Sequence, residues 1–423
     1  MKFTRVFAFM ALAGLAGSAF ATDGYFSHGY GMKAKGMGGA ATASSDDAFF
    51  GANNPAAAAF AGNRLDLGAD LFSPRREASR TGLGPLDASV DSDSKYFLIP
   101  EFGYNHMLNP DVALGVTVYG NGGMNSNYPG GQINCGTGAA NLLCGSGKLG
   151  VDLMQLIVAP TAAYKLAPNH SIGISPLIGY QRFKANGLQA FQMTPGVSSD
   201  PVNVTNRGYD DSFGYGVRIG YMGKIAPTVT IGAAYASKMQ FDEFSKYKGL
   251  FAEQGGFDIP ENYNLGVAWQ ATPAIQLAVD YQRINYSGVN SIGNPSTNMA
   301  QLGADNGPGF GWQDVDVWKL GVQYKYSQKL TLRAGYNHTD NPIASRDVTF
   351  NILAPGVVKD HATLGFTYTT ASGNEWTMAY MHAFKNDVTG TSILPAFSGN
   401  PPSGTEKIEM YQNSLGIQYS WKM

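Results

Sequence analysis

The sequence predicts an all-β fold, a transmembrane antiparallel β-barrel of about fourteen strands with an N-terminal plug, or hatch, inside its lumen. Three observations predict this class. Strand-like runs are joined by connections that alternate between very short and long, and an aromatic residue precedes nearly every short connection. Charged residues make up only 14 % of the chain, against about 25 % in an average soluble domain. Tight turns at one rim, long loops at the other and an aromatic girdle at each lipid–water boundary are typical of transmembrane barrels.

The aromatic residues before the short connections are spaced along the whole chain. They are Tyr104 before 109–111, Tyr164 before 167–169, Tyr221 before 226–228, Trp269 before 271–273, Tyr326 before 327–329 and Tyr368 before 371–374. A large soluble all-β protein is the alternative interpretation. Such a protein does not need a girdle aromatic at every short turn, so the pattern favours the membrane barrel.

Hydropathy agrees with strands rather than helices as the membrane-crossing elements. The mean hydropathy is slightly negative, at −0.15. Beyond the N-terminal leader, no run approaches the roughly 18 apolar residues that a membrane helix needs. Barrel strands alternate lipid-facing apolar residues with small or polar residues that face the lumen, so their hydropathy averages near zero.

The first 21 residues have the pattern of a secretory signal peptide. Lys2 and Arg5 form a charged region, residues 6–15 form an apolar region, and Ala19 and Ala21 provide a small-x-small cleavage site. The mature chain is therefore expected to begin at Thr22. Removal of the leader changes the formal charge from 29 − 31 = −2 to 27 − 31 = −4, which gives no reason to expect a nucleic-acid partner.

Period-two alternation of apolar residues, as at Phe213, Tyr215 and Val217, predicts the individual strands. The predicted strands are 65–72, 95–106, 112–120, 151–166, 171–184, 209–222, 228–241, 262–270, 274–286, 313–326, 329–338, 360–369, 374–385 and 407–422. An even number returns both termini to the side of the short turns, which by barrel convention is the periplasm. Pro100 and Pro176 fall inside predicted strands, and each is expected to mark a bulge or kink.

Two cysteines, Cys135 and Cys144, lie in the long Gly- and Asn-rich connection 121–150. An exported protein meets an oxidising compartment, so a disulfide within this loop is the expected state. A metal site is the alternative. No histidine lies between or beside the two cysteines, and two thiolates alone make a poor zinc site, so no metal is predicted.

Residues 22–63 precede the first predicted strand and show no clean helix or strand period. The segment is rich in Gly and Ala but carries six aromatic residues, Tyr25, Phe26, Tyr30, Phe49, Phe50 and Phe60. These rings must be buried somewhere. A barrel of about fourteen strands has a lumen too wide to be filled by its own side chains. We therefore expect residues 22–63 to form a hatch inside a barrel made by residues 64–423.

The hatch segment resembles that of the FadL/TodX (OMPP1) family of outer-membrane transporters. The resemblance rests on Gly24-Tyr25-Phe26, Gly29-Tyr30-Gly31, the run Lys35-Gly36-Met37-Gly38-Gly39-Ala40, Asp46-Asp47-Ala48 and Asn54-Pro55-Ala56. In architecture it covers the whole chain. It implies passive uptake of long-chain fatty acids or aromatic or aliphatic hydrocarbons, through a hatch-gated barrel that opens sideways into the bilayer of a Gram-negative outer membrane.

The resemblance also implies the partners. They are a hydrophobic small molecule, the lipid bilayer with its lipopolysaccharide, and the barrel-assembly machinery during biogenesis. The protein is expected to be a monomer, without a cofactor and without a nucleic-acid partner.

Candidate site residues follow from the same segment. We expect a substrate pocket or hatch site at Tyr25, Phe26, Phe49, Phe50, Asn54, Pro55 and Ala56. The alternative is that these rings only anchor the plug. Apolar residues of the outer loops are candidates for first contact with a ligand, namely Leu142, Leu143, Leu250 and Phe251.

The lateral opening is predicted in the third strand, at Tyr119, Gly120, Gly122 and Gly123. Family members often have a Pro-aromatic-Gly sequence there, and this chain does not. The run from Tyr119 to Met124 looks more like the hydrocarbon-uptake branch than the fatty-acid branch. Its glycines weaken a strand and favour a bulge.

Other function classes have less support. The six histidines are spread along the chain, and no Gly-x-Ser-x-Gly motif, phosphate loop or metal cluster is present in the sequence, so an enzyme is not predicted. A general polar porin is the first alternative, but scarce charge and the hatch oppose it. A structural or adhesive barrel, or a phage receptor, is the second alternative, and this role is compatible with transport.

Overall fold

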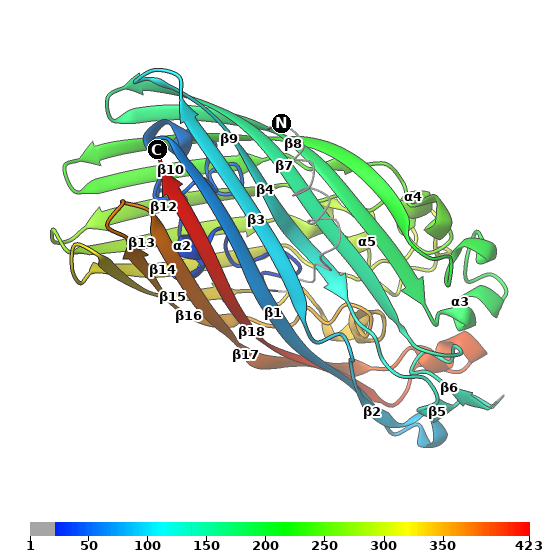
Figure 1. The fold of residues 1–423 in the computed structure, drawn as a ribbon. Coiled ribbons are helices and arrows are strands. Elements are labelled where there is room, and N and C mark those ends of the chain that lie inside the picture. The colour runs from blue at the N-terminus through cyan, green and yellow to red at the C-terminus, as the bar shows by residue number, and fades with distance from the viewer. Residues whose placement is uncertain (1–21, 137) are drawn as a thin grey trace.

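The fold is a closed antiparallel barrel. The computed structural model describes residues 22–136 and 138–423, so the predicted leader lies outside the described residues. Sixteen strands form one sheet, in which β2 and β11 are short additions to β1 and β9, and the other fourteen make the wall. Figure 1 shows this wall from the side. The first and last strands close it, from Arg64 opposite Lys422 to Thr81 opposite Thr405.

Each predicted strand corresponds to one strand of the wall, with β10 and β11 together in place of the seventh. The wall strands are β1 Arg64–Thr81, β3 Phe97–Met107, β4 Val112–Asn125, β7 Gly150–Ala167, β8 His170–Asn186, β9 Asp210–Ala226, β10 Val229–Ala236, β12 Asn262–Gln270, β13 Ile275–Ile284, β14 Val315–Lys325, β15 Leu330–Thr339, β16 Asp360–Thr369, β17 Glu375–Thr391 and β18 Thr405–Lys422. The remaining strands are β2 Ala88–Asp91, β5 Ile133–Asn134, β6 Ala139–Ala140 and β11 Gln240–Phe241. Several wall strands run further into the predicted loops than the alternation indicated, most clearly β1, β4 and β17.

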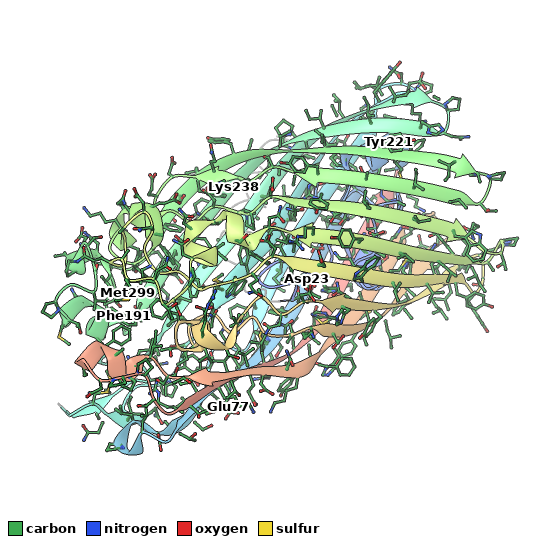
Figure 2. The ribbon with its side chains drawn as sticks, turned by 180° about the vertical axis from the view of Figure 1, so that it is seen from behind. Asp23, Glu77, Phe191, Tyr221, Lys238 and Met299 are labelled. Carbon is green, nitrogen blue, oxygen red and sulfur yellow. A yellow bond between two sulfur atoms is a disulfide. The ribbon has the colours of Figure 1, made fainter. Side chains whose placement is uncertain are left out.

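The two ends of the barrel differ in their connections, as Figure 1 shows. The turn end carries the short connections and the C-terminus, and the loop end carries the long ones. Short helical turns lie in the long connections: η2 Gly84–Leu86, α3 Gln189–Met193, η3 Pro201–Asn203, η4 Ser245–Tyr247, α4 Ala252–Gly255, η5 Tyr286–Gly288, α5 Asn290–Gly293, η6 Ser345–Asp347, α6 Val348–Asn351 and η7 Leu394–Ser398. No helix in the described part of the chain is long and apolar enough to cross a membrane. In Figure 2, Tyr221 lies toward the turn end and Phe191 and Met299 toward the loop end.

The outer face of the wall is apolar. Ile172, Ile174 and Ile178 of β8 are exposed, whereas Ser171, Ser175 and Gln181 of the same strand are buried and face the lumen. Exposed aromatic residues lie toward both ends of the strands, with Tyr164, Trp269, Tyr326 and Tyr368 near the short turns and Tyr215, Tyr263, Trp318 and Tyr336 further along. This alternation matches a lipid-facing surface with two girdles.

The two prolines lie where ladder pairing is incomplete. Pro100 is in the part of β3 that pairs with β1, beyond the last pair between β3 and β4. Pro176 of β8 lies between the pairs Val158–Ile178 and Ala162–Ile174, where the ladder to β7 has a gap. Proline has no N–H group to donate to a neighbouring strand. Pro100 and Pro176 each lie where one neighbouring strand is not paired and no N–H donor is needed toward it.

Residues 22–63 lie within the lumen, where Figure 1 shows them in dark blue. Helix α2 Met32–Lys35 contacts β16, β17 and β18, and the 3-10 helix η1 Pro55–Phe60 contacts β4, β7, β8 and β9. Most residues of the segment are buried. We call it the hatch segment.

Luminal glycines in the strands make room for the hatch segment. At ten of them, a Cβ would lie within 3.0 Å of a hatch atom: Gly103, Gly115, Gly122, Gly173, Gly220, Gly232, Gly266, Gly321, Gly335 and Gly416. At Gly335 that Cβ would be 2.1 Å from the amide nitrogen of Gly38. These luminal glycines therefore allow the hatch segment to lie in close contact with the wall.

A leucine in place of Gly335 should therefore displace the hatch. Overpacking of a close contact costs about 1–3 kcal/mol. The wall is held by continuous strand pairing, so we expect the hatch to shift rather than the wall. We expect Gly335→Leu to raise single-channel conductance and the rate of proteolysis within residues 22–63. Ala334→Leu is the matched control, because Ala334 is the preceding residue and points to the opposite face of β15. Equal behaviour of the two variants would contradict the tight fit.

Candidate functional site: an aromatic column that ends at a break in the wall

The N-terminal end of the hatch segment is packed among aromatic rings from the loops. The Tyr25 ring lies 5.3 Å from that of Tyr286 and 5.9 Å from that of Trp312, centroid to centroid. Phe26 lies 5.9 Å from Tyr286 in an edge-on arrangement. The Tyr286 hydroxyl accepts a hydrogen bond from the Tyr25 amide and donates one to the Asp23 carbonyl. These rings are buried and fix the position of residues 23–26.

The ring contacts continue from this cluster toward the loop end. Phe257 lies 6.4 Å from Tyr25 and 4.9 Å from Phe251. Phe251 in turn lies 4.7 Å from Phe183. We call the series Phe183, Phe251, Phe257, Tyr25 and Phe26 the aromatic column. It forms an unbroken apolar line from the loops to the hatch.

A small apolar pocket lies at the loop end of the column. Leu143, Phe183, Phe191, Leu250, Phe251 and Phe350 are among its lining residues. Its free volume is only about 30 Å³, far below the roughly 300–1,000 Å³ of ligand pockets. A ligand therefore enters this pocket only if side chains move. We call it the loop pocket.

The other end of the column meets a break in the wall between β3 and β4. The two strands pair from Met107 opposite Ala113 to Phe102 opposite Val118. Beyond that point their described residues form no further pairs with each other: β3 continues along β1 only, and β4 along β7 only. The register of β4 on β7 also shifts between Gly120 and Gly122, which is a bulge at Asn121.

Toward the loop end the break is bounded by loop contacts. The Asp93 amide donates to the Asn127 carbonyl at 2.8 Å, and the Asn127 amide donates to the Ser92 hydroxyl at 3.0 Å. The break is therefore a window with pairing on both sides of it. It is bordered by residues 97–101 of β3 and 119–125 of β4.

The hatch segment supplies the strand that is missing at the window. Phe26 forms a β-bridge with Gly122. The Gly123 amide donates to the Tyr25 carbonyl, and the Ser27 amide donates to the Asn121 carbonyl, both at 3.3 Å. The unpaired edge of β4 thus finds backbone partners in residues 25–27, as buried N–H and C=O groups require.

The other edge of the window is also joined to the hatch. Glu101 of β3 faces the lumen and accepts a hydrogen bond from the Gly31 amide at 3.1 Å. On the β4 side, the Tyr30 hydroxyl donates to the Asn121 carbonyl at 3.0 Å. Residues 25–31 therefore connect both edges of the window from inside the barrel.

Buried charges hold the rest of the hatch in place. Lys35 Nζ lies 2.9 Å from Asp70 and 2.7 Å from Glu101, and Lys33 Nζ lies 2.7 Å from Glu375. One Asp280 oxygen accepts hydrogen bonds from the backbone amides of residues 41 and 42, both at 2.8 Å. Each of these charges is paired or hydrogen-bonded, which offsets the cost of burial. The hatch is thus anchored by polar contacts below an apolar column.

Comparison with known proteins identifies the architecture. The profile of the outer membrane protein transport protein family (OMPP1/FadL/TodX) matches residues 9–396. The chain belongs to this family. It is therefore an outer-membrane transport protein, and its turn end faces the periplasm by barrel convention. A comparison with curated protein sequences gives no match.

Solved structures share the fold of this transporter. The toluene transporter TodX of P. putida has a TM-score of 0.69 and 18 % identity over 94 % of this chain and 99 % of its own. A FadL homologue of Pseudomonas aeruginosa has a TM-score of 0.72 and 15 % identity over 94 % and 99 %. The toluene transporter TbuX of Ralstonia pickettii has a TM-score of 0.64 and 18 % identity over the same shares.

The structure separates the predicted site residues into two groups. Tyr25 and Phe26 belong to the aromatic column, and the predicted opening residues Tyr119, Gly120, Gly122 and Gly123 border the window. Phe49 and Phe50 are buried but do not join the column. Phe50 instead packs with Ala56 and Ala113 of a smaller cluster that includes η1.

Asn54, Pro55 and Ala56 have a local structural role in this transporter. The Asn54 side chain accepts a hydrogen bond from the Ala56 amide and so caps η1, with Pro55 at the first turn. Its amide group also donates to the carbonyls of Thr42 and Tyr221. The tripeptide thereby fixes the turn-end part of the hatch to β9.

The outer-loop candidates also lie at different places. Leu143, Leu250 and Phe251 line the loop pocket. Leu142 is buried beside it, and its carbonyl accepts a hydrogen bond from Arg80. Cys135 and Cys144 form a disulfide with a Cα–Cα distance of 5.7 Å, in the same connection as the two leucines.

Sequence reasoning missed Phe257, Tyr286 and Trp312, which complete the aromatic cluster. Phe257 and Trp312 lie in long irregular connections, where no periodicity marks a residue as inward-facing. Tyr286 was the last residue of the predicted strand 274–286, and the structure places it in η5, just beyond the end of β13. The only available signal was the presence of large rings in segments otherwise rich in Gly, Asn and Pro. Rings of that kind need burial, and in this transporter the lumen provides it.

One carboxyl group of the hatch segment is buried without full pairing of its charge within the described part of the chain. Figure 2 shows Asp23 inside the barrel. Burial raises the pKa of Asp23 to about 6, although Lys319 and a hydrogen bond from Asn337 act in the opposite direction. Because the folded-state pKa is above the unfolded value, the protonated group contributes stability at low pH that is lost as pH rises through about 6.

We therefore expect the transporter's hatch to loosen as the pH rises from the ordinary aspartate pKa of 3.8 to the raised pKa of about 6, and to change little at higher pH. Hydrogen exchange of residues 24–31, corrected for the intrinsic rate at each pH, should show falling protection. Asp23→Asn keeps the shape and removes the ionisation, so its corrected protection should stay constant. A pH dependence that persists in Asp23→Asn would exclude Asp23 as its source.

Proposed function

We propose that the protein takes up hydrophobic compounds passively across the outer membrane and releases them sideways through the window between β3 and β4. The observation that carries this proposal is the aromatic column, which runs from the loop pocket to the hatch residues that fill the window. Monoaromatic hydrocarbons are the first candidate substrates. Two of the similar structures are described as toluene transporters and another as a monoaromatic hydrocarbon channel.

Uptake starts at the loop pocket. An apolar molecule gains about 0.8 kcal/mol for each methylene removed from water, which favours its transfer from the polar surface to a site lined by Leu250, Phe251 and Phe183. The ring faces of the column give an aromatic ligand a succession of similar contacts. An apolar pocket discriminates by only about 1–3 kcal/mol per methylene, so we expect a broad range of small substrates.

The hatch segment is the gate. At the window, residues 25–27 are held to β4 by two backbone hydrogen bonds, each of which contributes about 0.5–1.5 kcal/mol. A ligand that displaces the Phe26 ring from the column weakens this pairing at a modest cost. The window then opens from the lumen into the bilayer, where the ligand dissolves.

Lateral release fits the contents of the lumen. Residues 31–63 fill the half of the barrel nearest the periplasm and are joined to the wall by buried charges and close glycine contacts. We propose that this part of the hatch stays in place during transport and that only its first residues move. The division into a hatch of residues 22–63 and a barrel of residues 64–423 is part of this proposal, as is the cleaved leader 1–21.

A second substrate class is favoured by one buried cation. Arg76 of β1 is 3 % exposed, and the only hydrogen bond of its side chain within the described part of the chain goes to the Ser94 carbonyl at 3.2 Å. Its Nη2 atom and the buried Tyr128 hydroxyl have no partner there. An unpaired buried cation is costly. The carboxylate of a fatty acid or an aromatic acid would complement it.

Arg76→Met tests the choice between the two classes. If acids bind at Arg76, the variant should lose binding of an alkanoic acid by about tenfold or more, since hydrogen bonds to charged groups contribute about 1.5–3 kcal/mol. Binding of toluene should not change. The measurement is equilibrium binding of both ligands to purified protein, and an equal effect on both would show that Arg76 does not distinguish them.

We also propose that the protein is a monomer, that it is inserted by the barrel-assembly machinery and that it carries out no catalysis. Its partners are then the ligand and the surrounding lipid. Porin activity is the competing function. It requires an open aqueous path, whereas the hatch fills the lumen with buried side chains.

The proposal is tested by uptake and conductance in reconstituted vesicles, with the full-length protein and a variant that lacks residues 22–26. We expect saturable uptake of toluene or an alkanoic acid by the full-length protein, little conductance, and loss of saturable uptake on truncation, because Tyr25 and Phe26 are removed. Phe213→Ala is the control for loss of a ring from the lipid-facing side. Sugar flux with a large steady conductance would instead establish a porin.

A further inference from the structure

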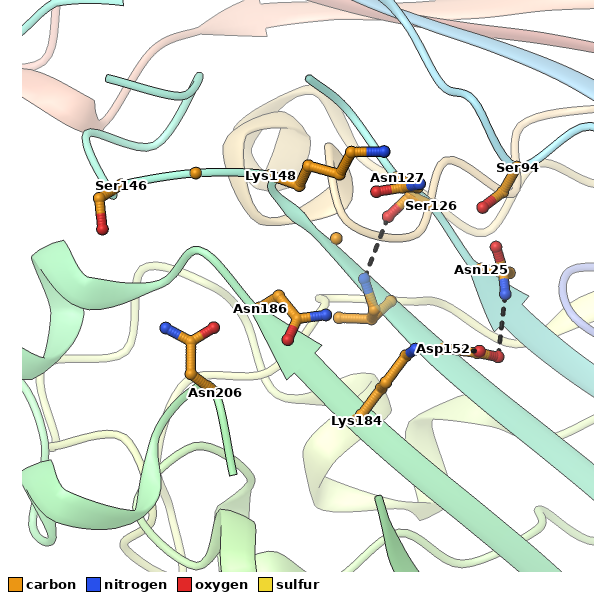
Figure 3. A pocket seen from close by; sticks show the side chains of 13 residues that line it. Ser94, Asn125, Ser126, Asn127, Ser146, Lys148, Asp152, Lys184, Asn186 and Asn206 are labelled. Atoms are coloured by element: carbon orange, nitrogen blue, oxygen red, sulfur yellow. Dashed lines mark hydrogen bonds and ion pairs between the residues drawn. The ribbon is translucent and has the colours of Figure 1, made fainter. Parts of the chain in front are cut away.

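A polar pocket lies on the outside of the barrel at its loop end, apart from the aromatic column. Figure 3 shows this pocket. It lies among the end of β4, the loop that precedes β7, the start of β7 and the end of β8. Its volume is about 480 Å³, within the range of small-molecule sites. Asn, Ser and Lys side chains dominate its lining: Asn125, Asn127, Asn186, Asn206, Lys148 and Lys184 are among them.

Strand alternation shows that the pocket faces outward. Lys184 and Asn186 continue the row of β8 residues that begins with the exposed Ile174 and Ile178 and passes through Tyr180. Asp152 of β7 is directly opposite Lys184 in the ladder. The pocket therefore lies just beyond the outer aromatic girdle, at the height where lipid headgroups begin.

The pocket contains polar groups that lack partners within the described part of the chain. Asn125 is 6 % exposed, and its Oδ1 atom has no hydrogen-bond donor. The side chains of Asn127 and Asn186 and the hydroxyl of Ser94 make no hydrogen bond there either. Buried or half-buried amides without partners are unusual. Together they offer both donors and acceptors to a ligand.

The charges around the pocket favour an anionic group over a cation. Lys148 and Lys184 line it, and the Arg182 guanidinium lies beside it, 4.4 Å above the Tyr209 ring. Two carboxylates oppose these three cations. Asp152 accepts hydrogen bonds from Tyr209 and Asn125 and lies 3.9 Å from Lys184 Nζ in a partly exposed pair, and Asp93 lies 3.6 Å from Lys148 in an exposed pair. Exposed pairs of that kind are weak, so Lys148 can turn to a ligand.

We propose that this pocket binds the phosphorylated amino-sugar headgroup of an outer-leaflet glycolipid, the lipid A part of lipopolysaccharide. The amides and hydroxyls would bind the sugar, and the two lysines would bind the phosphate. Basic pockets at the membrane surface recognise lipid headgroups in this way. Because Ser94, Asn125 and Asn127 adjoin the loop end of the window, the acyl chains of the bound lipid would lie along the wall beside it.

The test uses the purified full-length protein in nonionic detergent and measures binding of bis-phosphorylated lipid A by native mass spectrometry. The pocket variant is Lys184→Gln with Asn186→Ala. The control variant is Lys238→Gln with Gln240→Ala, which removes the same kinds of side chain at the same spacing on exposed positions of another part of the rim. Unchanged thermal unfolding of both variants establishes that each is folded.

We expect the pocket variant to bind lipid A about tenfold more weakly, which corresponds to about 1.4 kcal/mol, and the control variant to bind it as the unaltered protein does. Equal affinity of the two variants would overturn the proposal. The unaltered protein should bind dephosphorylated lipid A about tenfold more weakly than lipid A, because the two lysines then have no phosphate to bind. Equal binding of dephosphorylated lipid A and lipid A would also overturn the proposal. Displacement of lipid A by millimolar inorganic phosphate alone would show a phosphate site rather than a glycolipid site. None of these measurements depends on substrate uptake.

Discussion

The structure depends on one constraint, that the backbone edge of a strand inside a membrane cannot remain unpaired. Lipid offers no hydrogen bonds to a free N–H or C=O group. The wall nevertheless breaks between β3 and β4, and β4 has a free edge from Tyr119 onward. Residues 25–27 supply the missing partner. The hatch segment is therefore part of the wall at this place as well as a plug of the lumen.

The rest of the lumen is arranged so that those few residues reach the window. Glycines on the inner faces of the strands let the hatch backbone approach the wall, and buried ion pairs at Lys33 and Lys35 fix its path. Large rings from the loops then pack against residues 23–26 from the loop end of the barrel. Buried ion pairs at Lys33 and Lys35 hold the part of the hatch that we propose stays in place. Rings, two backbone hydrogen bonds and the contacts of Asp23 with Lys319 and Asn337 hold the part that we propose moves.

Local signals made most of the fold predictable from the sequence. Alternation and turn residues defined all fourteen strands, and the glycines after Tyr119 indicated a weak place in β4. The window itself involves two strands that stop pairing, and no pattern within either strand reports that event. Likewise, the sequence assigned both Tyr25 and Phe50 to the hatch because both are aromatic. Only the structure shows that Tyr25 lies in the aromatic column and that Phe50 packs beside η1. Trp312 was missed because irregular loops carry no period, and Tyr286, although it ended the predicted strand 274–286, was not assigned to the site.

The central claim is that the hatch completes the wall until a ligand displaces it. The most direct measurement is residue-resolved hydrogen exchange of the Gly123 and Ser27 amides, which donate across the window, with and without saturating toluene. The account predicts that both amides are protected without ligand and exchange faster with it, while the Val116 and Val118 amides, further down β4, keep their protection. Unchanged protection of Gly123 and Ser27 in a protein that binds and transports toluene would contradict it.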